Sequence, residues 1–162
     1  MELTQEQILL LNRINSKFLF KLFSIVKLPL AFLTGLKIVK LNADECVTNV
    51  RLKYLNKNPF GSTYFAVLSM AAELSTGAIA LIAAEGRHPS VAKIITSMKA
   101  DFIKKATGST KFTCTEGSKL FRAVNNAIAT KESQVETVSS IGCDRSGDVV
   151  AHFEFTWSFK QR

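Results

Sequence analysis

Residues 60 to 84 read FGSTYFAVLSMAAELSTGAIALIAA, a stretch in which Glu73 is the only charged residue. It is long enough to span a bilayer as a helix. A central carboxylate opposes insertion by roughly 2.5 to 3.5 kcal/mol, and the serines, threonines and glycines dilute the hydrophobicity further. A helix that is apolar on nearly all sides otherwise lies in a protein core. We therefore favour a buried core helix over a transmembrane helix.

Segments with strand periodicity flank this helix on both sides. Two of them, 36–41 and 46–54, precede it and are separated by a turn at Asn42-Ala43-Asp44. After the loop at Gly86-Arg87-His88-Pro89, alternation predicts four more strands, with a short helix at 120–129 between the second and the third. These strands are 92–102, 111–115, 135–143 and 149–160. In the first of them, strict alternation would place Ala92, Ile94, Thr96, Met98, Ala100 and Phe102 on one face.

This order of elements predicts an α+β fold. An antiparallel sheet of five to six strands that curls around one long central helix would bury that helix. At 162 residues, with 47% hydrophobic and 21% charged residues, the chain has the size and composition of one globular domain.

The first 35 residues differ from the rest of the chain. From Gln5 to about Val26, apolar residues recur at steps of three and four, which predicts one amphipathic helix. No acidic residue occurs between Glu6 and Asp44, whereas several basic residues do. The basic face is either solvated or in contact with an anionic membrane surface, and we favour the first. We divide the chain into an N-terminal amphipathic helical extension, 1–35, and one domain, 36–162.

Charge and cysteine content narrow the possible partners. The net charge of +8 suits an anionic partner, which could be a nucleic acid, a membrane surface or a phosphate-bearing ligand. The aromatic residues alternate along one strand face instead of interleaving with lysines, so we expect no nucleic-acid partner. The three cysteines and two histidines have no metal-ligand spacing, and we expect neither a metal nor a cofactor. The widely spaced cysteines and the acidic N-terminus, unlike a signal peptide, predict a cytoplasmic protein.

Two runs of residues resemble the central-helix motif of hotdog-fold thioesterases. They are Asn58-Pro59-Phe60-Gly61-Ser62-Thr63-Tyr64-Phe65-Ala66 and Ala71-Ala72-Glu73-Leu74-Ser75-Thr76-Gly77. The likeness is to the phenylacetate-degradation-type branch and its uncharacterised bacterial relatives, in which a loop Asn precedes the helix and an acidic residue lies about two turns into it. Residues 94–106 resemble the strand that follows, with Lys105 where the family usually has Pro. The resemblance covers about 36–160 and implies a hotdog fold, a homodimer that could pair into a homotetramer, and acyl-CoA hydrolysis without a cofactor.

The resemblance also implies roles for individual residues. Glu73 would act as general base or nucleophile, with a pKa raised by burial. Alternatively, it is a carboxylate bonded to hydroxyl groups across a dimer interface. The backbone N–H groups of Tyr64 and Phe65, at the helix start, would stabilise the oxyanion. The amide of Asn58 would position the water or the thioester, unless Asn58 caps the helix with Pro59 at its first position.

Further residues are candidates for binding the substrate. Gly61 and Ser62 would let the thioester approach the helix start closely. The hydroxyl groups of Thr96 and Ser97 would orient water, or the two residues would only fill the sheet. A loose basic group could hold the phosphates of coenzyme A or could be a solvated face; it comprises Lys104, Lys105, Lys111 and Arg122.

Two functions remain open. The first, which the resemblance implies, is an acyl-CoA thioesterase whose active site lies between subunits. The second is a non-catalytic protein that binds acyl chains or lipids and contacts membranes through its N-terminal helix. Many family members carry His-Gly-Gly where this chain has Tyr64-Phe65-Ala66, which favours the binding protein. The presence of Glu73 and Asn58 favours the enzyme.

Overall fold

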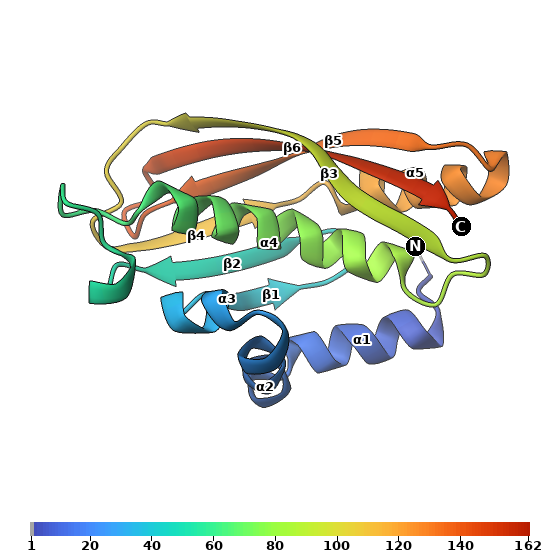
Figure 1. Cartoon of the computed structure of the whole chain (residues 1–162), viewed down its shortest axis with the longest axis horizontal. Helices are drawn as coiled ribbons and strands as arrows, with labels where there is room; N and C mark the ends of the chain where they lie inside the picture. The colour runs from blue at the N-terminus through green and yellow to red at the C-terminus, as the bar shows by residue number, and fades with distance from the viewer. Residues whose placement is uncertain (1) are drawn as a thin grey trace.

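The computed structural model describes residues 2–162, which form one sheet with helices against one face and along one edge (Figure 1). The helices are α1 (Gln5–Asn15), α2 (Lys17–Lys27), α3 (Pro29–Thr34), the short 3-10 helix η1 (Tyr54–Asn56), α4 (Phe65–Ala84) and α5 (Gly117–Thr130). The strands are β1 (Lys37–Leu41), β2 (Cys46–Arg51), β3 (Val91–Phe102), β4 (Ser109–Cys114), β5 (Gln134–Cys143) and β6 (Val149–Gln161).

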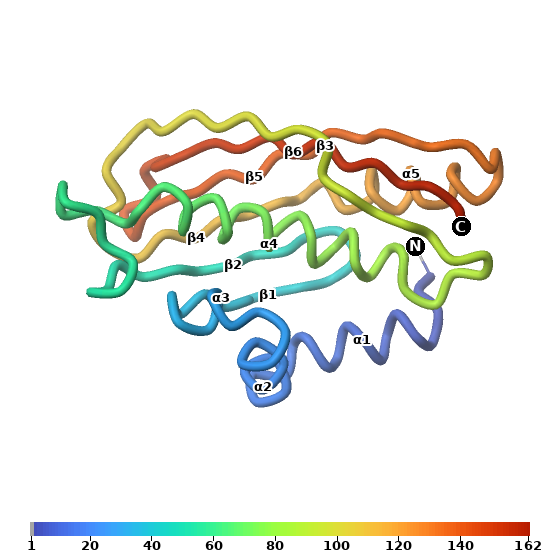
Figure 2. Tube along the Cα trace, viewed as in Figure 1, coloured from blue at the N-terminus to red at the C-terminus, as the bar shows by residue number. Residues whose placement is uncertain are grey.

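The six strands form one antiparallel sheet in the order β1-β2-β4-β5-β6-β3. The sheet curls around α4, and α5 packs beside α4 against β5 and β6 (Figures 1 and 2). β3, the strand that follows α4 in the chain, is the edge strand at one side of the sheet. The predicted α+β hotdog architecture, a curled sheet around one long central helix, is confirmed.

The core forms between α4 and the inner face of the sheet. In β6 the alternate residues Phe153, Phe155, Trp157 and Phe159 are buried, as their alternation predicts. Each of these rings contributes roughly 1.5 to 3 kcal/mol by leaving water. The facing helix is rich in buried alanine, which allows the sheet to approach closely; these residues are Ala71, Ala72, Ala78, Ala80 and Ala83.

Three buried polar contacts fix the rotation of α4. The hydroxyl groups of Ser75 and Ser140 share a hydrogen bond of 2.7 Å, and Trp157 Nε1 donates to Thr76 Oγ1 at 3.2 Å. The Thr48 hydroxyl donates to the carbonyl of Ala71 at 2.7 Å. A buried polar group needs a partner, so these bonds select one orientation of the helix in the sheet.

α4 is the one helix of the described residues that is long and apolar enough to cross a membrane. More than half of its most apolar stretch is buried inside the protein. Its half-buried positions form a stripe along one side, which includes Ala66, Met70, Glu73 and Gly77. The helix therefore packs in the core against the sheet. Its sequence predicts burial on nearly all sides, but one side is only half-buried.

The N-terminal segment differs from the single helix predicted over Gln5 to Val26. Ser16 has an extended backbone that ends α1, and its hydroxyl accepts a hydrogen bond from the N–H of Leu19 to cap α2. The prediction of one continuous helix is therefore wrong. Pro29 lies in the first turn of α3, where a missing N–H costs nothing. The division of the chain at residue 35 stays a prediction.

The prediction that alternate residues of β3 lie on one face of the sheet along its whole length is also wrong. A β-bulge lies between Ile95 and Ser97, so Thr96 has no partner in the pairing with β6. One extra residue reverses which side chains face each side of the sheet. Met98 pairs with Phe155 on the inner side, whereas Ile94 pairs with Ser158 on the outer side.

Candidate functional site

A cavity of about 550 Å³ lies at the N-terminal end of α4. Its walls come from the loop before α4, from the first turns of α4, and from the end of β3 with the loop after it. The lining residues are Asn58, Pro59, Phe60, Ser62, Thr63, Tyr64, Phe65, Leu68, Phe102, Ile103, Lys104, Lys105 and Ala106. Four predicted site residues are therefore brought together: Asn58, Ser62, Tyr64 and Phe65.

The loop before α4 is shaped by Asn58, which does not cap the helix. Its Oδ1 accepts hydrogen bonds from the N–H groups of Phe60 at 3.0 Å and Ser62 at 3.1 Å, and its Nδ2 donates to Ser62 Oγ at 3.0 Å. Gly61 has a positive φ of 75°, which lets the chain turn back so that Lys57 and Thr63 form a bridge. The prediction that Asn58 and Pro59 begin the helix is wrong, because this turn fills the intervening positions and α4 starts at Phe65.

The start of α4 presents backbone donors to the cavity. Tyr64 is the residue before the first helical turn, and its N–H donates to the carbonyl of Asn56 at 2.8 Å, so that donor is occupied. Within residues 2–162, the N–H groups of Phe65 and Ala66 have no acceptor. Such free first-turn donors, at the positive end of the helix dipole, favour an anion or a developing oxyanion.

A third donor is Thr63, which the sequence prediction did not include. Its side chain is 3% exposed, and its hydroxyl is the buried side-chain group of the described residues that lacks a hydrogen-bond partner. Thr63 lines the cavity, and its backbone N–H is held by the carbonyl of Ala106 at 2.9 Å. An unpaired buried hydroxyl costs about 1 to 3 kcal/mol, a cost that a ligand in the cavity would remove. In the sequence, only its position two residues before the first residue of the helix could have indicated Thr63.

Aromatic rings connect the cavity with the core. The rings of Tyr64 and Phe65 lie 4.8 Å apart, and Phe65 contacts Phe102 edge-on at 6.3 Å. Phe102 in turn meets Phe153 of the core at 5.6 Å. Phe65 and Phe102 are each about half exposed. This apolar wall suits the hydrocarbon part of a ligand whose polar group lies at the helix start.

Glu73 lies outside this cavity in the protomer. It is eight residues along α4 from Phe65, which corresponds to about 12 Å of helix. Its side chain is half-buried on the open stripe of the helix and, within residues 2–162, its carboxylate makes no hydrogen bond or ion pair. Burial raises the pKa of the Glu73 carboxyl. The protomer alone therefore does not bring Glu73 to Asn58.

Thr96 and Ser97 also lie apart from the cavity, whereas two lysines of the predicted basic group, Lys104 and Lys105, line it. The Thr96 hydroxyl donates to the carbonyl of Thr156 at 3.2 Å at the bulge of β3, and Ser97 is exposed beside it. In the predicted basic group, Lys104 Nζ contacts Asp144 Oδ2 at 2.7 Å and Asp148 Oδ2 at 2.6 Å. Lys104 is therefore neutralised by two carboxylates, and Lys105 is the member of that group beside it at the cavity.

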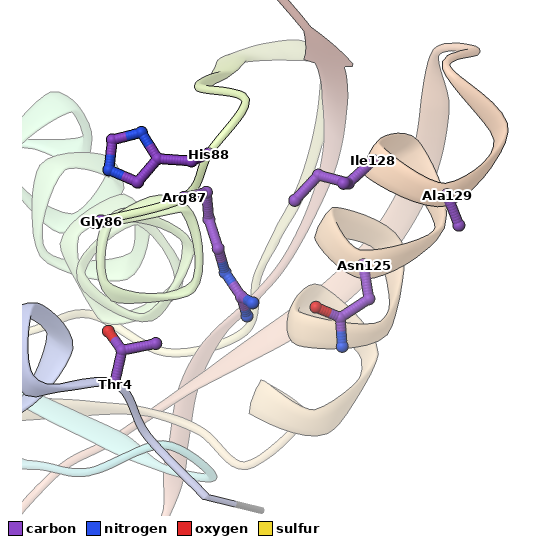
Figure 3. Close-up of a pocket in the computed structure, with 7 residues that line it drawn as sticks. All are labelled: Thr4, Gly86, Arg87, His88, Asn125, Ile128 and Ala129. Carbon is purple, nitrogen blue, oxygen red and sulfur yellow. The ribbon is translucent and has the colours of Figure 1, made fainter.

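A second cavity, of about 420 Å³, lies at the opposite end of α4 (Figure 3). Thr4, Arg87 and Asn125 are among its lining residues, and the Arg87 guanidinium points between the other two. Arg87 Nε donates to the carbonyl of Ala83 at 3.0 Å. A cation there complements the negative end of the helix. None of the predicted site residues lines this cavity.

Solved structures similar to this one cover most of the chain. Protein PA5026 of Pseudomonas aeruginosa, described as of unknown function and "Probable Thioesterase", has a TM-score of 0.74 and 18% identity, with 100% of each chain covered. Protein OLEI01261 of Chlorobaculum tepidum, of unknown function, has a TM-score of 0.72 and 14% identity over 88% of this chain and 92% of its own. Thioesterase HI1161 of Haemophilus influenzae has a TM-score of 0.63 and 13% identity over 86% and 88%. At these identities the likeness establishes the fold.

The resemblance to hotdog-fold thioesterases and their uncharacterised relatives is therefore confirmed at the level of the fold. No curated protein matches the sequence significantly. A family model described as "Domain of unknown function (DUF4442)" matches residues 16–159, a range that includes α2, the sheet up to Phe159 of β6, and the cavity at the start of α4. The chain belongs to this DUF4442 family of domains of unknown function.

Proposed function

We propose that the protein is an acyl-CoA thioesterase that acts as a homodimer, with each active site between two subunits. The observation that carries the proposal is the cavity at the start of α4, whose lining includes Thr63, Phe65 and an apolar wall. Within residues 2–162, the Thr63 hydroxyl has no hydrogen-bond partner, and neither the N–H of Phe65 nor that of Ala66 in the same helical turn has an acceptor. Solved structures named as thioesterases share the fold, which supports the same reaction class.

The edge strand β3 supports a dimer. It has twelve residues, and its exposed side chains include Ile94, Met98 and Phe102 at 65%, 51% and 51% exposure. A long edge strand with exposed apolar residues is a template for pairing with another strand. Two copies joined through β3 would continue the sheet and could bring Glu73 of one subunit toward the cavity of the other. Such a dimer supplies the acid–base group that the cavity of one protomer lacks.

In the proposed reaction, the thioester carbonyl oxygen lies at the N–H groups of Phe65 and Ala66, with the Thr63 hydroxyl as a third donor. These donors stabilise the negative charge that forms when water attacks the carbonyl carbon. Glu73 takes a proton from that water and returns it to the sulfur of coenzyme A as the C–S bond breaks. A carboxylate whose pKa is raised by burial is a stronger base for the first of these proton transfers.

The acyl chain would follow the wall of Phe65 and Phe102, and Lys105 would contact the phosphates of coenzyme A. Lys105 is one of two lysines at the cavity, and the other, Lys104, is already paired with Asp144 and Asp148.

We propose that this reaction occurs in the cytoplasm, without a metal or a cofactor.

The test is release of free thiol from short, medium, long and aromatic acyl-CoAs by the purified protein, compared with Glu73→Gln and the control Glu85→Gln. Glu85 follows the last residue of the same helix, at the end away from the cavity. Turnover that collapses in Glu73→Gln and persists in Glu85→Gln is the expected result. Turnover unchanged in Glu73→Gln would remove that residue from the mechanism, and no turnover of any substrate would end the enzyme proposal.

A second candidate is a protein that binds acyl thioesters without cleaving them. It is favoured by Tyr64-Phe65-Ala66 in place of His-Gly-Gly and by the position of Glu73 outside the cavity of its own protomer. Calorimetry with a non-hydrolysable acyl-CoA thioether separates the two. Binding together with thiol release from the matching thioester supports the enzyme, whereas binding without release supports the binding protein.

A further inference from the structure

The second helix of the chain exposes its apolar side chains and buries a serine. Ser24 is 3% exposed, whereas Phe18 is 75%, Leu22 is 54% and Val26 is 67% exposed. Residues 18, 22 and 25 or 26 share one helical face, and Ser24 lies on the opposite face. A helix that packs to complete a core has the reverse arrangement. The apolar face of α2 therefore points away from its own protein.

This helix is nevertheless held in place. The preceding helix α1 is anchored at both ends, because Gln7 Nε2 donates to the carbonyl of Ala83 in α4 at 3.4 Å and Asn15 Nδ2 donates to that of Leu41 in β1 at 2.9 Å. α2 follows after one residue and packs on α1 and α3, at the lower edge of the molecule in Figure 1. Its exposed face is thus a fixed part of the surface.

The apolar surface continues over α3 and η1. Leu30 and Leu33 of α3 are 59% and 56% exposed, and Leu55 of η1 is 69% exposed. The buried Asn56 joins these elements, since its Nδ2 donates to the carbonyl of Thr34 at 3.1 Å. We define this surface as the α2–α3 patch. It comprises Phe18, Leu19, Leu22, Phe23, Ile25, Val26, Leu30, Leu33, Tyr54 and Leu55.

The charges around the patch are of one sign. Lys17, Lys21 and Lys27 are exposed on α2, outside the face that carries Phe18, Leu22 and Val26. No acidic residue occurs between Glu6 and Asp44. An apolar face flanked by lysines is the pattern of a helix that lies in the plane of an anionic bilayer, with its apolar side in the acyl region and its ammonium groups among the headgroups.

We propose that the α2–α3 patch docks on a membrane surface that contains anionic phospholipids. The charge argues against a second copy of the chain as the occupant. A two-fold interface would place the same patch on both sides and bring like-charged lysines together without acidic partners. A bilayer with negative headgroups supplies both the apolar region and the counter-charge.

Docking there would hold the cavity close to the bilayer. Asn56 connects the two sites directly, because its side chain bonds the end of α3 and its carbonyl accepts the N–H of Tyr64 at the start of α4. Phe60, in the loop that lines the cavity, is 77% exposed. A ligand with an acyl chain could thus pass between the bilayer and the cavity over a short path.

The experiment is co-sedimentation of the full chain with vesicles of phosphatidylcholine alone and with vesicles that contain phosphatidylglycerol. The test variants are Val26→Ser and the double variant Lys17→Gln/Lys21→Gln. Their matched controls are Val135→Ser, since Val135 is 61% exposed on β5, and Lys160→Gln, since Lys160 is exposed on β6. Circular dichroism and light scattering check folding and mass.

We expect binding to the anionic vesicles, weakened by salt, with little binding to phosphatidylcholine alone. Val26→Ser should weaken it about tenfold, because one valine leaves the acyl region, and the lysine variant should weaken it on anionic vesicles only. Absence of vesicle binding, or equal loss in the controls, would overturn the proposal. A lower oligomeric mass in Val26→Ser would overturn it in favour of a second copy. The assay needs no turnover and is independent of the proposed hydrolysis.

Discussion

The carboxylate of Glu73 occupies space that Gly77 leaves open one turn further along α4. A Cβ atom built on Gly77 would lie 2.5 Å from Glu73 Oε1 and 3.4 Å from the ring of Trp157. The second distance is an ordinary contact, whereas the first is shorter than real contacts allow. Gly77 thus permits the orientation that the Glu73 carboxylate has in the structure.

Gly77→Ala should lower thiol release at least tenfold with little change in stability. The flexible carboxylate can move away from the added methyl group, and alanine favours a helix by about 1 kcal/mol over glycine, so the free energy of unfolding should stay within about 1 kcal/mol of the parent. Gly108→Ala is the control, because an added Cβ there meets nothing within 4 Å. Equal activity in Gly77→Ala and Gly108→Ala would show that the carboxylate orientation does not matter.

Glu73→Gln should raise the melting temperature at neutral pH and leave it unchanged at low pH. Burial raises the pKa of Glu73, so the folded state holds its proton more tightly than the unfolded state does. The free energy of unfolding therefore falls as the pH rises from the pKa of Glu73 in the unfolded state to its pKa in the folded state. Above the folded-state pKa, the full penalty for burying the charged carboxylate remains. Glutamine removes that penalty. Melting curves from pH 4 to pH 8 measure the difference, and a variant that is less stable at pH 7 would contradict it.

Thr63→Val should stabilise the unliganded protein by about 1 kcal/mol and slow thiol release. Valine keeps the shape of threonine while removing a buried hydroxyl that has no partner within residues 2–162. If the hydroxyl stabilises the oxyanion, its loss lowers kcat more than it raises KM. Thr63→Ser, which retains the hydroxyl, should keep kcat near that of the parent. Loss of stability in Thr63→Val would show that the hydroxyl is already satisfied in the free protein.

The sequence alone predicts the elements whose period is regular. The alternation through Phe153, Phe155, Trp157 and Phe159 gives β6 and its buried face, and the uncharged stretch around Glu73 gives α4. The bulge at Thr96 escapes prediction, because the apolar residues still alternate in the sequence on both sides of it, while the pairing with β6 shifts by one residue. The periodicity of side chains along the sequence predicts a strand, but it does not predict the register in which that strand pairs with its neighbour.

The site was predictable in part, for a related reason. Asn58, Tyr64 and Phe65 lie within a few residues of one another, so local sequence brings them to one cavity. Asn58-Pro59 has the composition of a helix cap, but the Asn58 side chain accepts hydrogen bonds from the loop N–H groups of Phe60 and Ser62 instead of from the helix. Thr63 became a candidate only because its hydroxyl has no hydrogen-bond partner within residues 2–162. Whether a buried hydroxyl finds a partner depends on residues that are distant in the sequence.

Alkylation should modify Cys143 in the folded protein and all three cysteines after unfolding. Cys46 and Cys114 face each other across β2 and β4 and are fully buried. Burial raises the pKa of the Cys114 thiol to about 11 and that of Cys46 further, so neither forms the reactive thiolate at pH 8. Cys143, at the end of β5, is half-buried. Iodoacetamide labelling at pH 8, with intact-mass and peptide analysis, should find one added group in the native protein, none in Cys143→Ser, and three in urea. Native labelling of Cys46 or Cys114 would show that β2 and β4 separate readily.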